Sequence, residues 1–258
     1  MDLGQMVSAA AGRSAADIDG ALRAARTRAR SAKRALQPQD VFTAFGIEHR
    51  NMALDHRIAI HECGHAIVHH VLGMGRVKRV ALTTTGGGTW LRSAPVEGLI
   101  SDCENQLIHL LAGRAAERLV LGAPTAGAGG SETSDLALAT AKAVEIDTRL
   151  GLGAEGLAWT DLDQGLYLRD AENAARVRSR LEDAEARALS ILSEQESLLK
   201  GMGDALFKAR MLEGDTLECW IREIGAAFTD FTDQSPGENR TEFRAQIEPP
   251  RYPPGSGP

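Results

Sequence analysis

The chain has 258 residues, of which 43% are hydrophobic and 25% are charged, so it carries enough apolar side chains for one large domain or two small ones. Only 4% of the residues are aromatic while Ala and Leu are abundant, and this balance favours a mainly helical protein over a β-sandwich or barrel. The formal net charge of -6 argues against a nucleic-acid-binding protein, because such proteins hold phosphates with an excess of Lys and Arg.

The cysteines and the apolar runs indicate the cellular setting. Cys63, Cys103 and Cys219 lie far apart and form no CxxC pair, so neither a disulfide framework nor a cysteine zinc site is expected. No run of about 18 apolar residues occurs, so no membrane span is expected in this chain. The first residues also lack the apolar stretch of a signal peptide. These features favour a reducing, cytoplasmic setting, and the alternative is membrane association through a partner or a missing N-terminal region.

A basic amphipathic helix is predicted near the N-terminus, over residues 14–36, where apolar side chains recur at helical spacing among arginines. Pro38 ends this helix and opens a short second helix that reaches Phe45. Residues 1–50 are therefore expected to form a small helical appendage. The simpler interpretation of the pattern alone is a solvated amphipathic helix.

The part over residues 51–227 is predicted to be mainly helical with one small β element. A helix from about residue 56 ends at Gly73, and a strand over 76–85 is followed by a glycine turn and a short strand at 89–91. Further helices are predicted over residues 101–121, 131–150, 171–200 and 215–224. The rest of the chain, 228–258, holds six of the nine prolines and few apolar residues, which predicts a disordered tail.

The HECGH stretch at residues 61–65 is the most informative for chemistry. Two histidines four residues apart lie one turn apart on a helix, so His61 and His65 can bind one tetrahedral zinc ion. Glu62 lies about 100° round the helix from His61 and can take a proton from a zinc-bound water without binding the metal itself. The sequence therefore predicts a zinc hydrolase site with Glu62 as its catalytic base.

A catalytic zinc site needs a third protein ligand and leaves its fourth position to water. Asp135 is the candidate, since it starts a predicted helix after the small-residue loop 122–134 and could reach back to the metal. Taken alone, an acidic residue there is more simply a charge favoured by the helix dipole, so the residues leave the choice open. His69 and His70 are expected to lie behind the ligands or on the surface, because a straight helix cannot bring three successive turns to one ion.

Three segments follow one another in the order of a known family. HECGHAIVHHVLG, LLAGRAAERLVLG and GGSETSDLALAT resemble the zinc helix, the following helix and the third-ligand segment of the FtsH family, the ATP-dependent zinc metalloproteases. That family's third zinc ligand is an aspartate, which falls on Asp135. The resemblance runs from about residue 54 to residue 224 and implies a helical zinc metallopeptidase domain. Glu117, the other carboxylate that could serve as third ligand, is then expected to pack or to lie behind the ligands.

The resemblance also implies partners. Residues 14–45 are similar to the last helices of the AAA+ ATPase lid that precedes the peptidase in this family. The chain has no GxxxxGK[ST] loop, because Ala128 stands where the lysine would follow Gly122 and Gly127. We therefore expect a fragment of a longer protein or a natural peptidase-only relative. The family implies unfolded polypeptide substrates, a homo-hexamer, and either a separate AAA+ ATPase or a missing ATPase module.

Two departures from the family and three rival functions stay open. Cys63 replaces a small residue beside the catalytic glutamate, and it is either a small apolar side chain or a thiol that inhibits on oxidation. The stretch 83–91 aligns loosely with a strand that could pair with an extended substrate, or it is only a turn. The rivals are an ATP-independent peptidase, a non-catalytic structural or adaptor subunit with the same fold, and another HExxH hydrolase with a different third ligand.

Overall fold

The computed structural model describes residues 10, 13–45, 51–83, 86–126, 129–154 and 156–232, with side chains described as far as Ile224. The predicted tail over 228–258 lies outside the described residues except for 228–232, which end the last helix. Helices make up most of the described chain and three strands form one sheet, so the mainly α fold class is confirmed. None of the described helices is long and apolar enough to cross a membrane.

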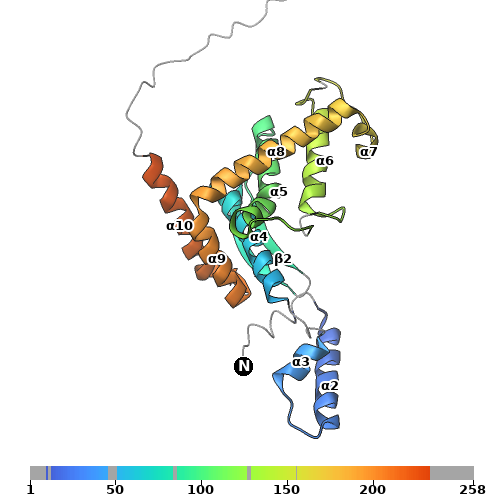
Figure 1. The fold of residues 1–258 in the computed structure, drawn as a ribbon, viewed down its shortest axis with the longest axis vertical. Helices are drawn as coiled ribbons and strands as arrows, with labels where there is room; N and C mark the ends of the chain where they lie inside the picture. Colours follow the sequence, from blue (N-terminus) through green and yellow to red (C-terminus); the bar gives the residue numbers. More distant parts are fainter. Residues whose placement is uncertain are drawn as a thin grey trace, which may run out of the picture.

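The N-terminal helical pair consists of α2 (Ala15–Ser31) and α3 (Pro38–Ala44), drawn in blue in Figure 1. Both predicted helices are present, although the first ends at Ser31 rather than at residue 36. The pair has its own small core, separate from that of the remaining helices. This core consists of Ala21, Ala25, Val41 and Phe45.

An ion pair holds the turn between these two helices. Both carboxylate oxygens of Asp40 accept hydrogen bonds from the guanidinium of Arg34, at 2.6 and 2.7 Å. The backbone N–H of Gln37 donates a third bond to the same carboxylate at 2.9 Å. The bonds from Arg34 and Gln37 lower the pKa of Asp40 to about 2, so the carboxylate stays ionised although the residue is buried.

Two long helices, α4 (Met52–Val71) and α5 (Ile100–Leu121), pack against each other at the centre of the larger body. The side chain of Asn51 caps the start of α4 by accepting a hydrogen bond from the N–H of Leu54. Gly73, with a φ of +64°, follows its end, as the sequence predicts. The large core around α4 and α5 is what holds the predicted zinc helix in place.

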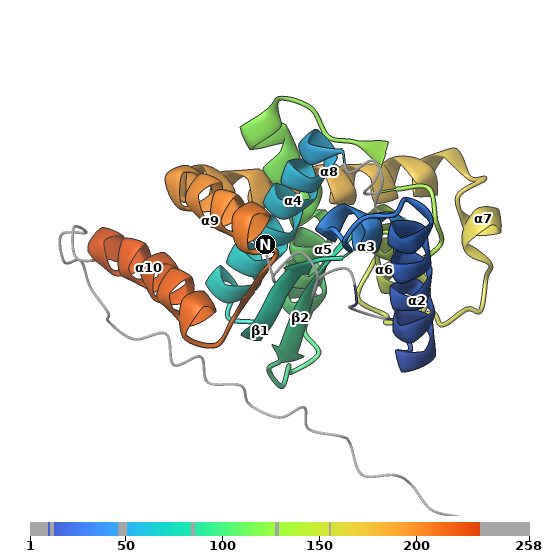
Figure 2. The same cartoon turned by 90° about the horizontal axis from the view of Figure 1, so that it is seen from below.

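A three-stranded antiparallel sheet lies against α4. β1 (Gly75–Leu82) is its centre, with β2 (Gly87–Ser93) on one edge and β3 (Met211–Glu213) on the other. Figure 2 shows β1 and β2 side by side. The first two strands are predicted by the sequence. The third is not, because three residues are too few to show an alternating pattern and the pairing joins segments far apart in the chain.

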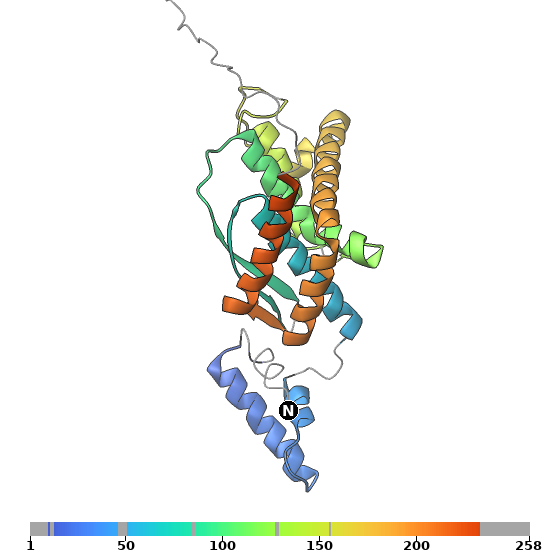
Figure 3. The ribbon, with the colours of Figure 1, turned by 90° about the vertical axis from the view of Figure 1, so that its left-hand side faces the viewer.

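The remaining helices differ from expectation at their ends. The prediction of one helix over 171–200 is wrong: α8 (Ala171–Glu194) and α9 (Glu196–Ala209) are separate helices. The chain bends at Gln195, whose φ of -114° and ψ of 18° are not helical. The bend lets α9 pack on α4, and α10 (Gly214–Thr232) lies beside α9 (Figure 3). α10 is also longer than its predicted span.

A buried carboxylate ties α6 (Asp135–Thr148) to α8 and to the short helix α7 (Gln164–Tyr167). Asp147 is fully buried and accepts hydrogen bonds from Arg180 at 3.0 Å and from the hydroxyl of Tyr167 at 3.2 Å. Burial opposes its ionisation, but the bonds from Arg180 lower the pKa of Asp147 below its ordinary value. This network fixes the helix whose first residue is Asp135.

Candidate metal centre

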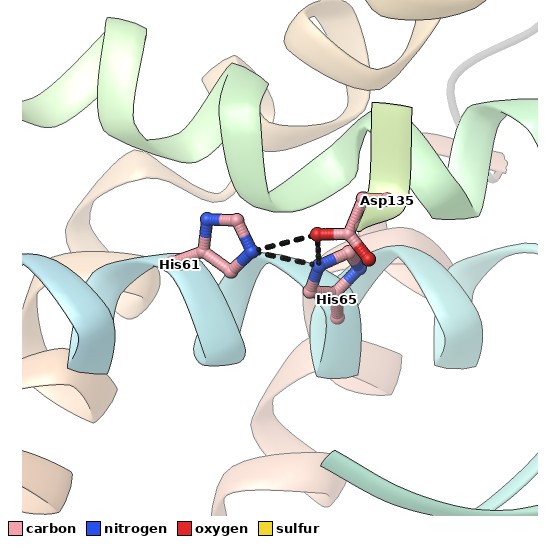
Figure 4. Close-up of side chains that lie close together, drawn as sticks. All are labelled: His61, His65 and Asp135. Carbon is pink, nitrogen blue, oxygen red and sulfur yellow. Dashed lines mark hydrogen bonds and ion pairs between the residues drawn. The ribbon is translucent and has the colours of Figure 1, made fainter. Parts of the chain in front are cut away.

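Three side chains converge between α4 and the first turn of α6 (Figure 4). The Nε2 atoms of His61 and His65 lie 3.1 Å apart, and they lie 3.0 and 3.3 Å from Oδ2 of Asp135. Around a tetrahedral ion with bonds of about 2.0–2.1 Å, ligand atoms are about 3.3–3.4 Å apart. Two imidazole nitrogens and one carboxylate oxygen at this spacing therefore fit one tetrahedral metal ion and leave a fourth position for water.

His61 is held from behind by a buried carboxylate. Its Nδ1 donates a hydrogen bond to Oε1 of Glu117 at 2.8 Å, which turns Nε2 towards Asp135. Glu117 is itself bound by Arg57 at 2.9 Å and by the N–H and hydroxyl of Thr125 at 2.9 and 3.0 Å. Burial opposes its ionisation, but the bonds from His61, Arg57 and Thr125 lower the pKa of Glu117 to about 2. Glu117 therefore faces the ring nitrogen that points away from the three-atom cluster and does not belong to that cluster.

Gly113 on α5 leaves room for the imidazole of His61. A Cβ atom at this position would lie 2.4 Å from Nε2 of His61, well inside any allowed contact. The backbone of α5 thus forms one wall of the site at a distance that only glycine permits.

His65 is held by a backbone carbonyl. Its Nδ1 donates to the carbonyl oxygen of His109 at 2.9 Å, and this leaves Nε2 facing His61 and Asp135. The ring of His109 stands between the rings of His65 and His69, with centroids 5.2 Å apart in both cases. Burial lowers the pKa of His109 to about 3, so this ring is neutral and brings no competing charge to the site. His69 is buried behind the ligands rather than on the surface, whereas His70 is only half-buried.

The electrostatics of the cluster favour a cation. Burial alone lowers the pKa of His61, yet the hydrogen bonds to Asp135 and Glu117 and the charge of Glu62 raise it to about 9. Burial likewise opposes ionisation of Asp135, but His61 and His65 bring the pKa of Asp135 below its ordinary value. The negative charges that favour the protonated form of His61 also favour a metal cation bound at the same position.

Glu62 is attached to the sheet rather than to the metal cluster. Its Oε2 accepts a hydrogen bond from the hydroxyl of Thr89 on β2 at 2.9 Å, and the same hydroxyl lies 3.0 Å from its backbone carbonyl oxygen. Strand β2 approaches so closely that a Cβ atom on Gly87 would lie 2.8 Å from Oε1 of Glu62. Glu62 is half-buried beside the ligands and points its carboxylate at the strand that borders the site.

Cys63 belongs to the large hydrophobic core and is fully buried. Burial raises the pKa of the Cys63 thiol well above its ordinary value, so the group is a neutral thiol without nucleophilic character. These observations support a packing role for Cys63 over a reactive one.

Several groups around the predicted site were not anticipated. The carbonyl of His109 carries no sequence signal, because any residue type supplies a carbonyl oxygen. Arg57 lies one helical turn before the HECGH motif, and Thr125 lies in the small-residue loop. Only their hydrogen bonds to Glu117 assign them to the site. Thr89 was expected in a strand, but its bond to Glu62 depends on the distance between sheet and helix.

Comparison with known proteins identifies the family. Residues 51–219 match the family model described as Peptidase family M41. The chain belongs to this peptidase family. It is 36% identical over 176 residues to ATP-dependent zinc metalloprotease FtsH 1 of Symbiobacterium thermophilum, a match that covers 64% of this chain and 28% of that protein. It is 30% identical over 209 residues to ATP-dependent zinc metalloprotease FtsH of Paraburkholderia phymatum, covering 70% of this chain and 32% of that one.

A similar relation holds to ATP-dependent zinc metalloprotease FtsH 4 of Synechocystis, which is 26% identical over 211 residues. The M41 match includes the HECGH helix, the Glu117 helix and Asp135. In each of these comparisons the chain spans about a third or less of the curated relative's length.

Proposed function

We propose that this chain is a zinc-dependent endopeptidase that hydrolyses peptide bonds of unfolded or flexible polypeptides. The observation that carries the proposal is the spacing of His61, His65 and Asp135, whose three ligand atoms lie 3.0 to 3.3 Å apart with Glu62 next in sequence to the first ligand. The relatives are named zinc metalloproteases, which agrees with a zinc ion at such a site.

The zinc ion, when bound by these three residues, supplies Lewis-acid polarisation of a water molecule and of the scissile carbonyl. Glu62 takes a proton from the attacking water and returns it to the leaving amine. Thr89 positions the Glu62 carboxylate, and Glu117 keeps the His61 ring turned towards the metal position. Glu117 and Thr89 act as positioning residues through these side-chain hydrogen bonds.

Substrate binding is assigned to the free edge of β2. This strand borders Glu62, and no other strand in the described part of the chain pairs with its outer edge. An extended substrate segment can add to such an edge through backbone hydrogen bonds. Proline substitutions within residues 87–91 should weaken peptide binding, and unaltered binding would exclude this mode.

An ATPase ring is the proposed partner. The relatives are named ATP-dependent, and residues 1–50 with their separate small core are assigned to the end of an ATPase lid preceding the peptidase unit over 51–227. Assembly into a ring of six would use exposed apolar surface between α6 and α8. The exposed large side chains of that stretch are Leu150, Leu152, Leu157, Trp159 and Leu166.

The first test is the zinc content of the purified chain, compared between wild type, Asp135→Ala and the exposed control Asp183→Ala. About one zinc per chain in wild type and control, and much less in Asp135→Ala, is the expected result. Retention of zinc by Asp135→Ala would move the third ligand elsewhere. A folded wild-type chain that does not bind added zinc would exclude the zinc-peptidase function. The non-catalytic structural subunit would then be the remaining function.

A further inference from the structure

The outer face of β2 carries an exposed aromatic and an exposed cation. Along the strand, Thr89 turns towards α4, where it bonds Glu62, and Leu91 packs against the large core. Because side chains alternate along a strand, Trp90 and Arg92 lie on the opposite face, and both are exposed. These two side chains thus stand next to the residue that holds the proposed base.

A bulge in β1 places further cations on the same face. The register pairs Arg76 with Arg92 and Arg79 with Trp90, with an irregularity at Lys78 between them. In a regular strand, residues 76 and 79 would lie on opposite faces. The extra residue shifts the alternation by one position, so both arginines of β1 share the outer face with Arg92. Like charges placed directly opposite one another on neighbouring strands repel, so this arrangement favours an added negative charge.

All but one of these arginines have a partner. Arg76 forms an ion pair with Glu218 of α10. Arg79 stacks over the ring of Trp90, with Cζ 4.0 Å from the centroid, and lies opposite Glu213 of β3 in the sheet register. Arg92 makes no ion pair with any carboxylate in the part of the chain that the structure describes, and it sits on the edge strand itself.

We propose that Trp90 and Arg92 determine substrate preference, selecting an extended segment with an apolar side chain facing Trp90 and an acidic side chain facing Arg92, two residues apart. This inference rests on the proposed peptidase function and on pairing of the substrate with β2. Side chains of an added strand alternate with the same period as those of β2, so one face of the substrate meets both residues. Arg92 lies three residues beyond Thr89, which is about 10 Å along the strand. The acidic side chain is therefore recognised a few residues away from the position of the scissile bond.

The test uses binding rather than cleavage, so that it stands apart from catalysis. The probes are fluorescein-labelled ten-residue peptides with one Leu. In each peptide, every second residue on either side of this Leu is Glu, Gln or Lys, so these side chains share one face of the extended peptide. The repetition keeps such a side chain near Arg92 even if the peptide binds in a shifted register. Their dissociation constants are measured by fluorescence anisotropy on the full chain carrying Glu62→Gln, loaded with zinc. The variants added to this background are Arg92→Glu, Arg92→Lys and the matched control Arg178→Glu, which changes an exposed arginine on α8.

The expected order of affinity is Glu, then Gln, then Lys, with a step of roughly threefold for one exposed charge pair. Arg92→Glu should reverse the order, Arg92→Lys should keep it, and Arg178→Glu should leave it unchanged. Zinc content should be equal in all variants, since Arg92 contacts no residue of the metal centre.

Equal affinity for the three peptides, or an order that Arg92→Glu leaves unchanged, would overturn the inference. Arg92 would then be a charge that only protects an edge strand from pairing with another sheet edge. Absence of binding by every peptide would overturn it as well. Failure of the proposed function has a different signature, because the wild-type chain would then cleave none of these peptides even where its charge preference in binding is clear.

Discussion

The two helix pairs of this protein, α4–α5 and α2–α3, are held together by different means. The central pair belongs to a large apolar core and can therefore keep Glu117 buried and hold His61 half-buried close to Asp135 of α6. The N-terminal pair has four core side chains and depends on the polar link between Arg34 and Asp40. A large core tolerates buried charge at a functional site, whereas a small core needs a charge pair to hold even its own turn.

The largest expected effect is that of Glu62→Gln, which should change catalysis without changing the fold. Loss of the base should lower kcat for peptide hydrolysis by about 10²- to 10⁴-fold, because proton transfer at this position is removed while the shape is kept. Zinc content and thermal stability should stay as in the wild type. Full activity in this variant would show that Glu62 is not the base.

A smaller but still large effect is expected from Glu117→Gln. The amide keeps the shape but loses the charge that orients His61 and pairs with Arg57, so zinc affinity should fall by about 10- to 100-fold. Competition with a chromophoric zinc chelator measures this change. Glu185→Gln, which alters a carboxylate paired with Arg114 and Arg118 away from the site, is the control and should bind zinc normally.

One glycine from each helix pair, Gly113 on α5 and Gly20 on α2, gives a direct comparison of how tightly the two pairs are packed. Gly113→Ala should destabilise the protein by about 1–3 kcal/mol and displace the His61 ring, because the new methyl group would lie 2.4 Å from Nε2. Gly20→Ala on α2 meets nothing within 4 Å and should stabilise the helical pair by about 0.5–1 kcal/mol. Urea unfolding curves compare the two, and equal effects would show that the α5 wall is not tight.

The smallest expected effect is the response of the helical pair to acid. The pKa of Asp40 is lowered from about 3.8 to about 2 in the folded state, so its contribution is present above pH 4 and is lost as the pH falls towards 2. The protection of the α2 and α3 amides, which compares their exchange rate with the intrinsic rate at the same pH, should fall over this window. Asp40→Asn should remove that dependence and raise the exchange rate already at neutral pH; an unchanged profile would exclude the Arg34–Asp40 link as the cause.

By itself, the sequence determined the helix that carries His61, Glu62 and His65 and the prediction of a zinc site there, because both depend on spacing within one helix. It also predicted the first two strands and the resemblance that points to Asp135. Local signals were sufficient here, since each pattern is complete within a short segment.

Only the tertiary structure decided how the parts meet. The end of α8 at Gln195, the pairing of β3 with β1 and the burial of His69 depend on contacts between distant segments. The same holds for the bonds of Glu117 to His61 and of Thr89 to Glu62, each of which joins two separate elements. Long-range packing chooses among several local possibilities, and a single sequence carries little direct signal of that choice.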